Sequence, residues 1–272
     1  MNDVVDRYTE IARRFVRARL AAAALMDFPG EIPDDLAGSY ACQDFAIDLW
    51  PDRIAGWKIG RINAPEDARL GCDRLAGPIF SSAVTVADGV GPTPFPVFVG
   101  GFAAAEAEFV FEIGRDAPPG QKTWTCDEAM ALVAEVYVGI ETAGSPLATI
   151  NDLGPLAVAS DFGNNAGLIL GSALENWRDR PASQWICETL IDGAKVGQGA
   201  ASDLPGGPFE AMRFIAEHCA WRGRALTAGT LISTGAITGV HDMIEGQTAT
   251  IHFGGVGDLA CVAIPAMRSD GE

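Results

Sequence analysis

Basic residues are scarce in this chain of 272 residues, which has 19 Lys and Arg against 36 Asp and Glu and a formal net charge of −17 at pH 7. Nucleic acid and anionic membrane surfaces would repel such a chain, so we expect neither as a partner.

A long apolar run is also missing. The longest stretch without a charge, residues 89–105, is broken by glycine and proline and cannot form a membrane-spanning helix.

Several motifs are absent as well. The chain has no Walker loop, no Rossmann fingerprint and no C-x-x-C pair, and its three histidines lack metal-ligand spacing. The six scattered cysteines therefore predict reduced thiols, with a disulfide framework as the less favoured alternative. The first six residues are acidic and lack the basic region of a signal peptide, so we expect a cytoplasmic protein.

The hydrophobic spacing predicts an α+β chain, with a helical N-terminal segment at residues 1–55 and a strand-rich, glycine-punctuated body at residues 56–272. Helical spacing occurs over residues 4–26 and 36–50, and again over 127–136 and 208–221. Short β-like runs occupy residues 56–62, 83–86, 95–99, 106–113, 136–141, 167–170, 230–234, 247–253 and 259–264.

Two glutamates, Glu106 and Glu108, flank one alanine in an otherwise apolar run. In a strand both would point to one face, while Ala107, Phe109 and their alternate neighbours would form the face that a core buries. Their Cα atoms would lie roughly 6.5–7 Å apart, close enough for both carboxylates to reach one cation. The charged face of a half-exposed strand would produce the same spacing, so the pattern alone leaves both interpretations open.

A third carboxylate, Glu141, ends an apolar β-like run, where burial would require a compensating partner. Three carboxylates without a nearby histidine suit a hard cation that prefers oxygen ligands, Mg²⁺ first and then Mn²⁺ or Ca²⁺. Lys58, within Gly-Trp-Lys-Ile-Gly at residues 56–60, is either a solvated lysine on a strand face or an anion-binding or acid/base lysine. Asp161 begins a polar run, residues 161–167, that could orient a water or a carboxylate.

Together these segments resemble the fumarylacetoacetate hydrolase superfamily, and the resemblance spans about residues 55–264. Its motifs, in the family's order, are Gly-Trp-Lys-Ile-Gly at 56–60, Leu-Gly-Cys at 70–72, Glu-Ala-Glu at 106–108, Arg-Asp at 115–116, Gly-Ile-Glu at 139–141, Asp161 with its polar run, Ser-Thr-Gly-Ala-Ile-Thr-Gly at 233–239 and Phe-Gly-Gly-Val-Gly at 253–257. The most similar branch contains the 2-keto-4-pentenoate hydratases and the related 4-oxalocrotonate decarboxylases.

The resemblance implies a mixed β-roll body, a homo-oligomer and a site for Mg²⁺ or Mn²⁺. It assigns metal binding to Glu106, Glu108 and Glu141. We further expect catalytic roles for Lys58 and Asp161, and substrate binding by Ser233 and Thr234. The hydrolase branch usually carries a His and a Glu on an N-terminal lid. No such pair is found here, which favours a hydratase or a decarboxylase.

The expected activity is metal-dependent addition of water to a 2-hydroxy-dienoate or 2-oxo-enoate, in the catabolism of aromatic or related compounds. Metal-dependent decarboxylation of a 2-oxo-enedioate is an alternative, because both reactions use the same electron sink. A non-catalytic acidic scaffold or accessory subunit is a second alternative, because three residues depart from the family's pattern: Ala76 replaces a common Asp, Ala104 a common basic residue and Pro146 a common Arg. Retention of all three glutamates and Lys58 argues against the scaffold.

Overall fold

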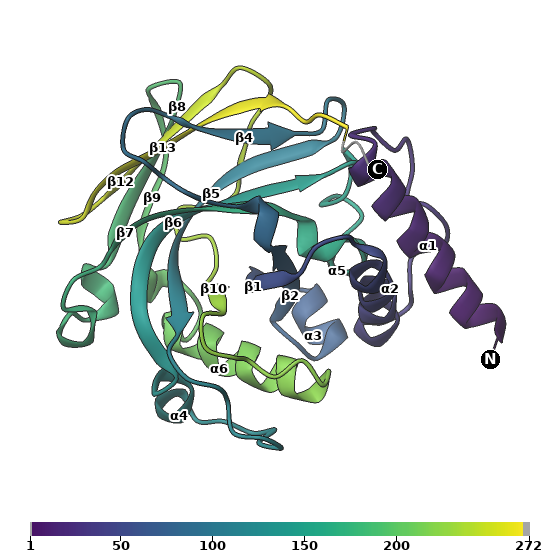
Figure 1. Cartoon of the computed structure of the whole chain (residues 1–272), viewed down its shortest axis with the longest axis horizontal. Helices are drawn as coiled ribbons and strands as arrows, with labels where there is room; N and C mark the ends of the chain where they lie inside the picture. Colours follow the sequence, from purple (N-terminus) through teal and green to yellow (C-terminus); the bar gives the residue numbers. More distant parts are fainter. Residues whose placement is uncertain (1, 269–272) are drawn as a thin grey trace.

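Two curled sheets form the body of the computed structural model, which describes residues 2–268 (Figure 1). The larger sheet has the order β2-β1-β10-β5-β6-β7-β3, with β11 beside β5, and the smaller sheet has the order β4-β13-β12-β8-β9. The strands are β1 Ile54–Arg61, β2 Arg74–Phe80, β3 Val84–Val86, β4 Thr93–Val97, β5 Phe102–Ile113, β6 Val133–Ser145, β7 Asn165–Ala173, β8 Ile186–Ile191, β9 Ala194–Ala200, β10 Leu231–Ser233, β11 His241–Asp242, β12 Thr248–Phe253 and β13 Gly257–Pro265.

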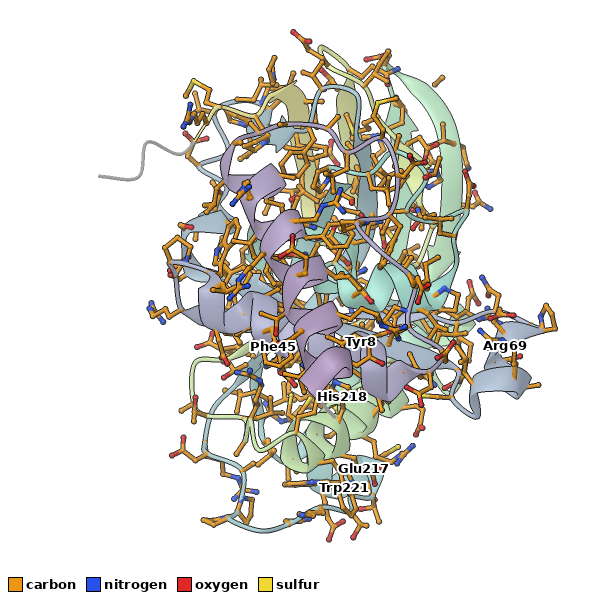
Figure 2. All side chains as sticks on the ribbon, turned by 90° about the vertical axis from the view of Figure 1, so that its right-hand side faces the viewer. Tyr8, Phe45, Arg69, Glu217, His218 and Trp221 are labelled. Atoms are coloured by element: carbon orange, nitrogen blue, oxygen red, sulfur yellow. The ribbon has the colours of Figure 1, made fainter. Side chains whose placement is uncertain are left out.

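Helices lie beside the sheets. They are α1 Asn2–Leu20, α2 Leu36–Leu49, α3 Glu66–Leu70, α4 Cys126–Met130, α5 Pro155–Ser160 and α6 Gly207–Trp221. Of these, α5 and α6 contact the larger sheet at β2. In Figure 1, α1 and α2 lie together at the right and α6 lies below β10. Figure 2 shows the molecule from the α1 side, with His218, Glu217 and Trp221 marking α6. Within residues 2–268, no helix combines the length and the apolar character that a membrane crossing requires.

One hydrophobic core joins the N-terminal helices to the sheets. Ala12 and Val16 of α1 and Ala46 of α2 belong to the same buried cluster as Trp57 of β1 and Phe111 of β5. The first strand begins at Ile54, close to the predicted boundary between residues 55 and 56. The N-terminal helices therefore share one hydrophobic core with the sheets.

The central strand β5 is buried on both faces. Phe109 packs towards the smaller sheet, with its ring centroid 5.3 Å from that of Trp185 and 5.7 Å from that of Phe253. On the opposite face, Glu106 is 6% exposed and Glu108 is 0% exposed. The alternative of a half-exposed strand with a solvated charged face is therefore wrong.

Two predicted helices are shorter than their hydrophobic spacing suggested. The helix expected over residues 127–136 ends at Met130, because Val133 and Val136 belong to β6 and pair with β5. The helix expected over residues 4–26 ends at Leu20, since Ala22 adopts a left-handed φ of 48° and Leu25 bridges to Leu147. In both cases a backbone contact with a segment distant in sequence, a strand in the first and an isolated bridge in the second, overrides a local preference.

A close approach at Gly77 joins β2 to the turn Phe162–Asn164. A Cβ atom at Gly77 would lie 1.9 Å from the backbone oxygen of Phe162, and Gly77 is the register partner of Lys58. The absent side chain therefore lets the polar turn after Asp161 approach the part of β1 that carries the lysine.

We predict that Gly77→Ala lowers the free energy of unfolding by about 3 kcal/mol, because the added methyl group meets backbone that cannot rotate away. Urea unfolding followed by circular dichroism measures the loss. Gly91→Ala is the matched control, since no atom lies within 4 Å of the Cβ position there. Equal midpoints for the two variants would contradict the close approach.

Candidate metal centre

Three buried carboxylates meet in the middle of the larger sheet. Glu106 and Glu108 point to the same face of β5, and Glu106 is the antiparallel register partner of Glu141 on β6. Each glutamate offers one carboxylate oxygen, and these three atoms all lie within 4.8 Å of one another. The structure therefore brings together the three glutamates that the sequence predicted as one cluster.

The carboxylate of Glu141 is held by one of its two oxygens. Oε1 lies 3.1 Å from Nζ of Lys58 and accepts a hydrogen bond of 3.1 Å from Nδ2 of Asn165. The other oxygen, Oε2, is buried and has no hydrogen-bond partner among the described residues. Glu141 is thus anchored on one side and unsatisfied on the other.

Glu108 repeats this arrangement with different partners. Its Oε2 accepts hydrogen bonds from Oγ of Ser233 at 2.6 Å and from the backbone N–H of Gly235 at 2.8 Å. Its Oε1 is buried without a partner among residues 2–268. Ser233 therefore supports a carboxylate of the cluster.

These unsatisfied oxygens fit a divalent cation. Burying a carboxylate oxygen without a donor is costly, and a cation between the glutamates would satisfy both orphaned atoms together. The donor set consists of carboxylate oxygens, with neither sulfur nor imidazole, and this chemistry matches Mg²⁺, Mn²⁺ or Ca²⁺ rather than Zn²⁺. Glu106, Glu108 and Glu141 are therefore suited to hold such an ion.

Burial, followed by the crowding of like charges, raises the pKa values of two carboxyl groups in the cluster. Burial raises the pKa of Glu106 to about 7, although attraction to Lys58 opposes the shift. Burial and then repulsion from Glu141 and Glu106 raise the pKa of Glu108 well above its usual range. Burial alone would lower the pKa of Lys58, but attraction to the three glutamates outweighs it and keeps the lysine charged. The lysine thus supplies a positive charge beside the three carboxyl groups.

A cavity of about 770 Å³ leads to this cluster. Lys58, Glu106 and Thr234 line it together with apolar side chains that include Ile62, Leu75, Leu204 and Ile237. Thr234 is itself fixed, because its Oγ1 donates to the backbone oxygen of Phe109 at 2.8 Å. The cavity thus offers several charged groups, Arg61 and Arg74 among them, beside apolar walls, a lining suited to a small organic acid.

Asp161 lies outside the cluster and does not line the cavity. Its Oδ1 lies 2.6 Å from Nε of Arg19, and its Oδ2 accepts hydrogen bonds from Nη2 of Arg19 at 3.0 Å and from Ser145 at 2.6 Å. Both oxygens are therefore occupied, and the geometry does not support the catalytic role expected for Asp161. It acts instead as the buried counter-ion of Arg19.

Sequence reasoning missed two residues near the site. Asn165 lay within the polar run after Asp161, but its spacing did not distinguish it from its neighbours. Arg19 resembled the exposed arginines of the same helix, such as Arg17. Neither residue could be singled out without the contacts that long-range packing creates.

The family model described as "Fumarylacetoacetate (FAA) hydrolase C-terminal" matches residues 78–264. This chain belongs to the fumarylacetoacetate hydrolase family. The match begins in β2 and ends in β13, so it covers the strands that carry all three glutamates. The mixed helix and sheet architecture expected from the resemblance is confirmed.

Individual relatives carry two kinds of name. A 2-keto-4-pentenoate hydratase of Burkholderia vietnamiensis (strain G4 / LMG 22486) is 25% identical over 229 residues, which are 83% of this chain and 85% of that protein. A 4-oxalocrotonate decarboxylase of Pseudomonas putida is 27% identical over 105 residues, 39% of this chain and 40% of that protein. The solved 4-oxalocrotonate decarboxylase of Pseudomonas putida G7, complexed with magnesium and adipate, shares the fold with a TM-score of 0.79 and 18% identity, covering 95% of this chain and 98% of that chain.

We predict that Glu108→Gln lowers the affinity for Mn²⁺ by at least roughly 100-fold, because a neutral amide replaces a carboxylate ligand. Isothermal titration of metal-free protein measures affinity and stoichiometry. Glu112→Gln is the control, since Glu112 lies on the same face of β5 and its carboxylate is instead bonded to Tyr137. Unchanged Mn²⁺ binding by Glu108→Gln would contradict the assigned ligands.

Proposed function

We propose that this protein is a metal-dependent hydratase that adds water to a 2-hydroxy-dienoate or its 2-oxo-enoate tautomer. The observation that carries the proposal is the buried cluster of three glutamates, with two unsatisfied oxygens, beside a charged lysine at a cavity. The hydratase names of several relatives support it.

The chain's own residues define the chemistry available at the site. Glu106, Glu108 and Glu141 would hold one divalent ion, which when bound withdraws electrons from a 2-oxo group and stabilises the enolate. Lys58 supplies a positive charge at the cavity for the carboxylate of an anionic substrate. Its ammonium form can also donate a proton while the substrate changes between its dienol and 2-oxo-enoate forms.

Decarboxylation of a 2-oxo-enedioate is the second candidate. It is favoured by the relative named 4-oxalocrotonate decarboxylase and requires the same stabilisation of an enolate. A non-catalytic scaffold is less well supported, because buried carboxylates with unsatisfied oxygens destabilise a fold that does not use them.

Direct assay distinguishes these functions. Purified protein with Mg²⁺ or Mn²⁺ would be incubated separately with 2-hydroxypenta-2,4-dienoate and with 2-oxohex-3-enedioate. A hydratase converts the first to a 4-hydroxy-2-oxo acid, seen by NMR, whereas a decarboxylase releases CO₂ from the second. Chelation of the metal should stop either reaction. Absence of turnover with both substrates, in protein shown to contain the metal, would favour the scaffold.

We predict that Lys58→Met lowers the turnover number by roughly 10²–10⁴-fold if the lysine transfers a proton in the transition state. If it only binds the substrate carboxylate, KM rises and turnover is largely preserved. Steady-state kinetics at saturating Mn²⁺ separate these results, and the Mn²⁺ stoichiometry should stay unchanged. Lys195→Met, at an exposed lysine on β9, is the control. Wild-type kinetics for Lys58→Met would exclude both roles.

A further inference from the structure

The pairing of β6 with β7 shifts by one residue next to the third glutamate. Glu141 is paired with Leu168 and Thr142 with Gly167, whereas the next pair is Ala143 with Asn165. Ala166 is therefore the extra residue of a β-bulge on β7. Bulges of this kind redirect neighbouring side chains.

The bulge decides which face of the sheet carries Asn165. Without the shift, Asn165 would lie opposite Gly144, on the face away from Glu141. With the shift it lies opposite Ala143, which shares a face with Glu141 because side chains alternate along a strand. Nδ2 of Asn165 can then donate both to Oε1 of Glu141 and to the backbone oxygen of Gly167, each at 3.1 Å.

Arg19 of α1 donates hydrogen bonds to the backbone of both strands, β6 and β7, next to this bulge. Its Nη1 donates to the backbone oxygen of Asn165 and its Nη2 to that of Gly144, each at 2.9 Å. The side chain of Arg19 is 4% exposed, and Asp161 fixes the orientation of its guanidinium through two contacts. The rings of Phe98 and Phe162 lie 5.6 and 5.1 Å from its central carbon. The guanidinium therefore has a fixed orientation and connects β6 to β7 through its hydrogen bonds.

We propose that Asn165 positions Glu141 for the divalent cation and that Arg19 acts on the same carboxylate through Asn165. The proposal rests on the metal-dependent function proposed above. Asn165 and Lys58 both hold Oε1, which leaves Oε2 directed to the cation. Donors behind a metal ligand fix its orientation, and their removal typically costs about 10- to 100-fold in metal affinity. The N-terminal helix thereby acts on the metal centre indirectly, through the residue that supports Glu141.

The test measures Mn²⁺ affinity in the full chain by isothermal titration. Asn165→Leu, which keeps the side-chain size but removes the donor, should weaken binding by about 10- to 100-fold. Arg19→Lys keeps the charge beside Asp161 but loses the planar fork, and it should also weaken binding. The double variant should bind no more weakly than Asn165→Leu alone, because both changes remove the same support. Arg17→Lys, at an exposed position on α1, should bind Mn²⁺ like the wild type.

If Arg19→Lys does not fold, Arg19→Met combined with Asp161→Asn replaces it and leaves no unpaired buried charge. Wild-type affinity in Asn165→Leu, even with a lowered unfolding midpoint, would show a merely structural role and overturn the inference. Losses of binding free energy that add up in the double variant would also overturn it, because Arg19 would then act independently of Asn165. A wild-type protein that binds no Mn²⁺ would contradict the proposed function as well, whereas the other outcomes leave that function intact.

Discussion

The burial of three carboxylates between the central strands constrains the surrounding structure. Glu108 and Glu141 are fully buried and Glu106 is exposed only at the cavity, so the protein has to supply donors from elements on either side. β1 contributes the ammonium group of Lys58, β10 and the residues after it contribute Ser233 and a backbone N–H, and β7 contributes Asn165. The strand order β1-β10-β5-β6-β7 places these donors around the cluster. The sheet topology therefore determines which side chains can stabilise the buried carboxylates.

The N-terminal segment also belongs to this arrangement. Arg19 is separated by 142 residues from Asp161, yet the two form a buried ion pair next to the start of β7. The backbone oxygen of Pro146 accepts a hydrogen bond of 2.8 Å from the N–H of Leu25 and thereby joins the segment after α1 to the end of β6. Ala76 and Ala104 are fully buried and add no charge. Positive charge close to the glutamates therefore comes from Lys58, while Arg19 neutralises Asp161 behind the site.

The glutamate cluster and Lys58 are suited to enolate chemistry at the 2-oxo end of a substrate, and this part of the reaction is common to hydration and decarboxylation. What separates the two reactions is the group that occupies the rest of the cavity: a water next to an alkene carbon, or a second carboxylate. Both arginine and aliphatic side chains line the cavity, among them Arg61, Arg74 and Ile237. The two proposed functions therefore differ in what they require of the rest of the cavity lining and not in what they require of the three glutamates.

Local periodicity was sufficient to predict several features of this protein. The helices at 36–50 and 208–221 agree with Leu36–Leu49 and Gly207–Trp221, and the period of two placed Glu106 and Glu108 on one face. Glu141 and Lys58 were singled out by an apolar run and by a motif of the family, and the structure places both beside these two glutamates. These predictions succeeded because each depends on residues within a few positions of one another.

Only the tertiary structure decided which residues lie opposite one another. The burial of β5 on both faces, the pairing of Glu106 with Glu141 and the early end of the helix at Met130 all depend on strands distant in sequence. The bulge at Ala166 and the contact of Arg19 with Asp161 are equally non-local. A repeating pattern specifies the face of a strand to which a side chain points, but it contains no information about the register of the neighbouring strand. That register is set by packing of the whole sheet, and it determines here which donors reach the buried carboxylates.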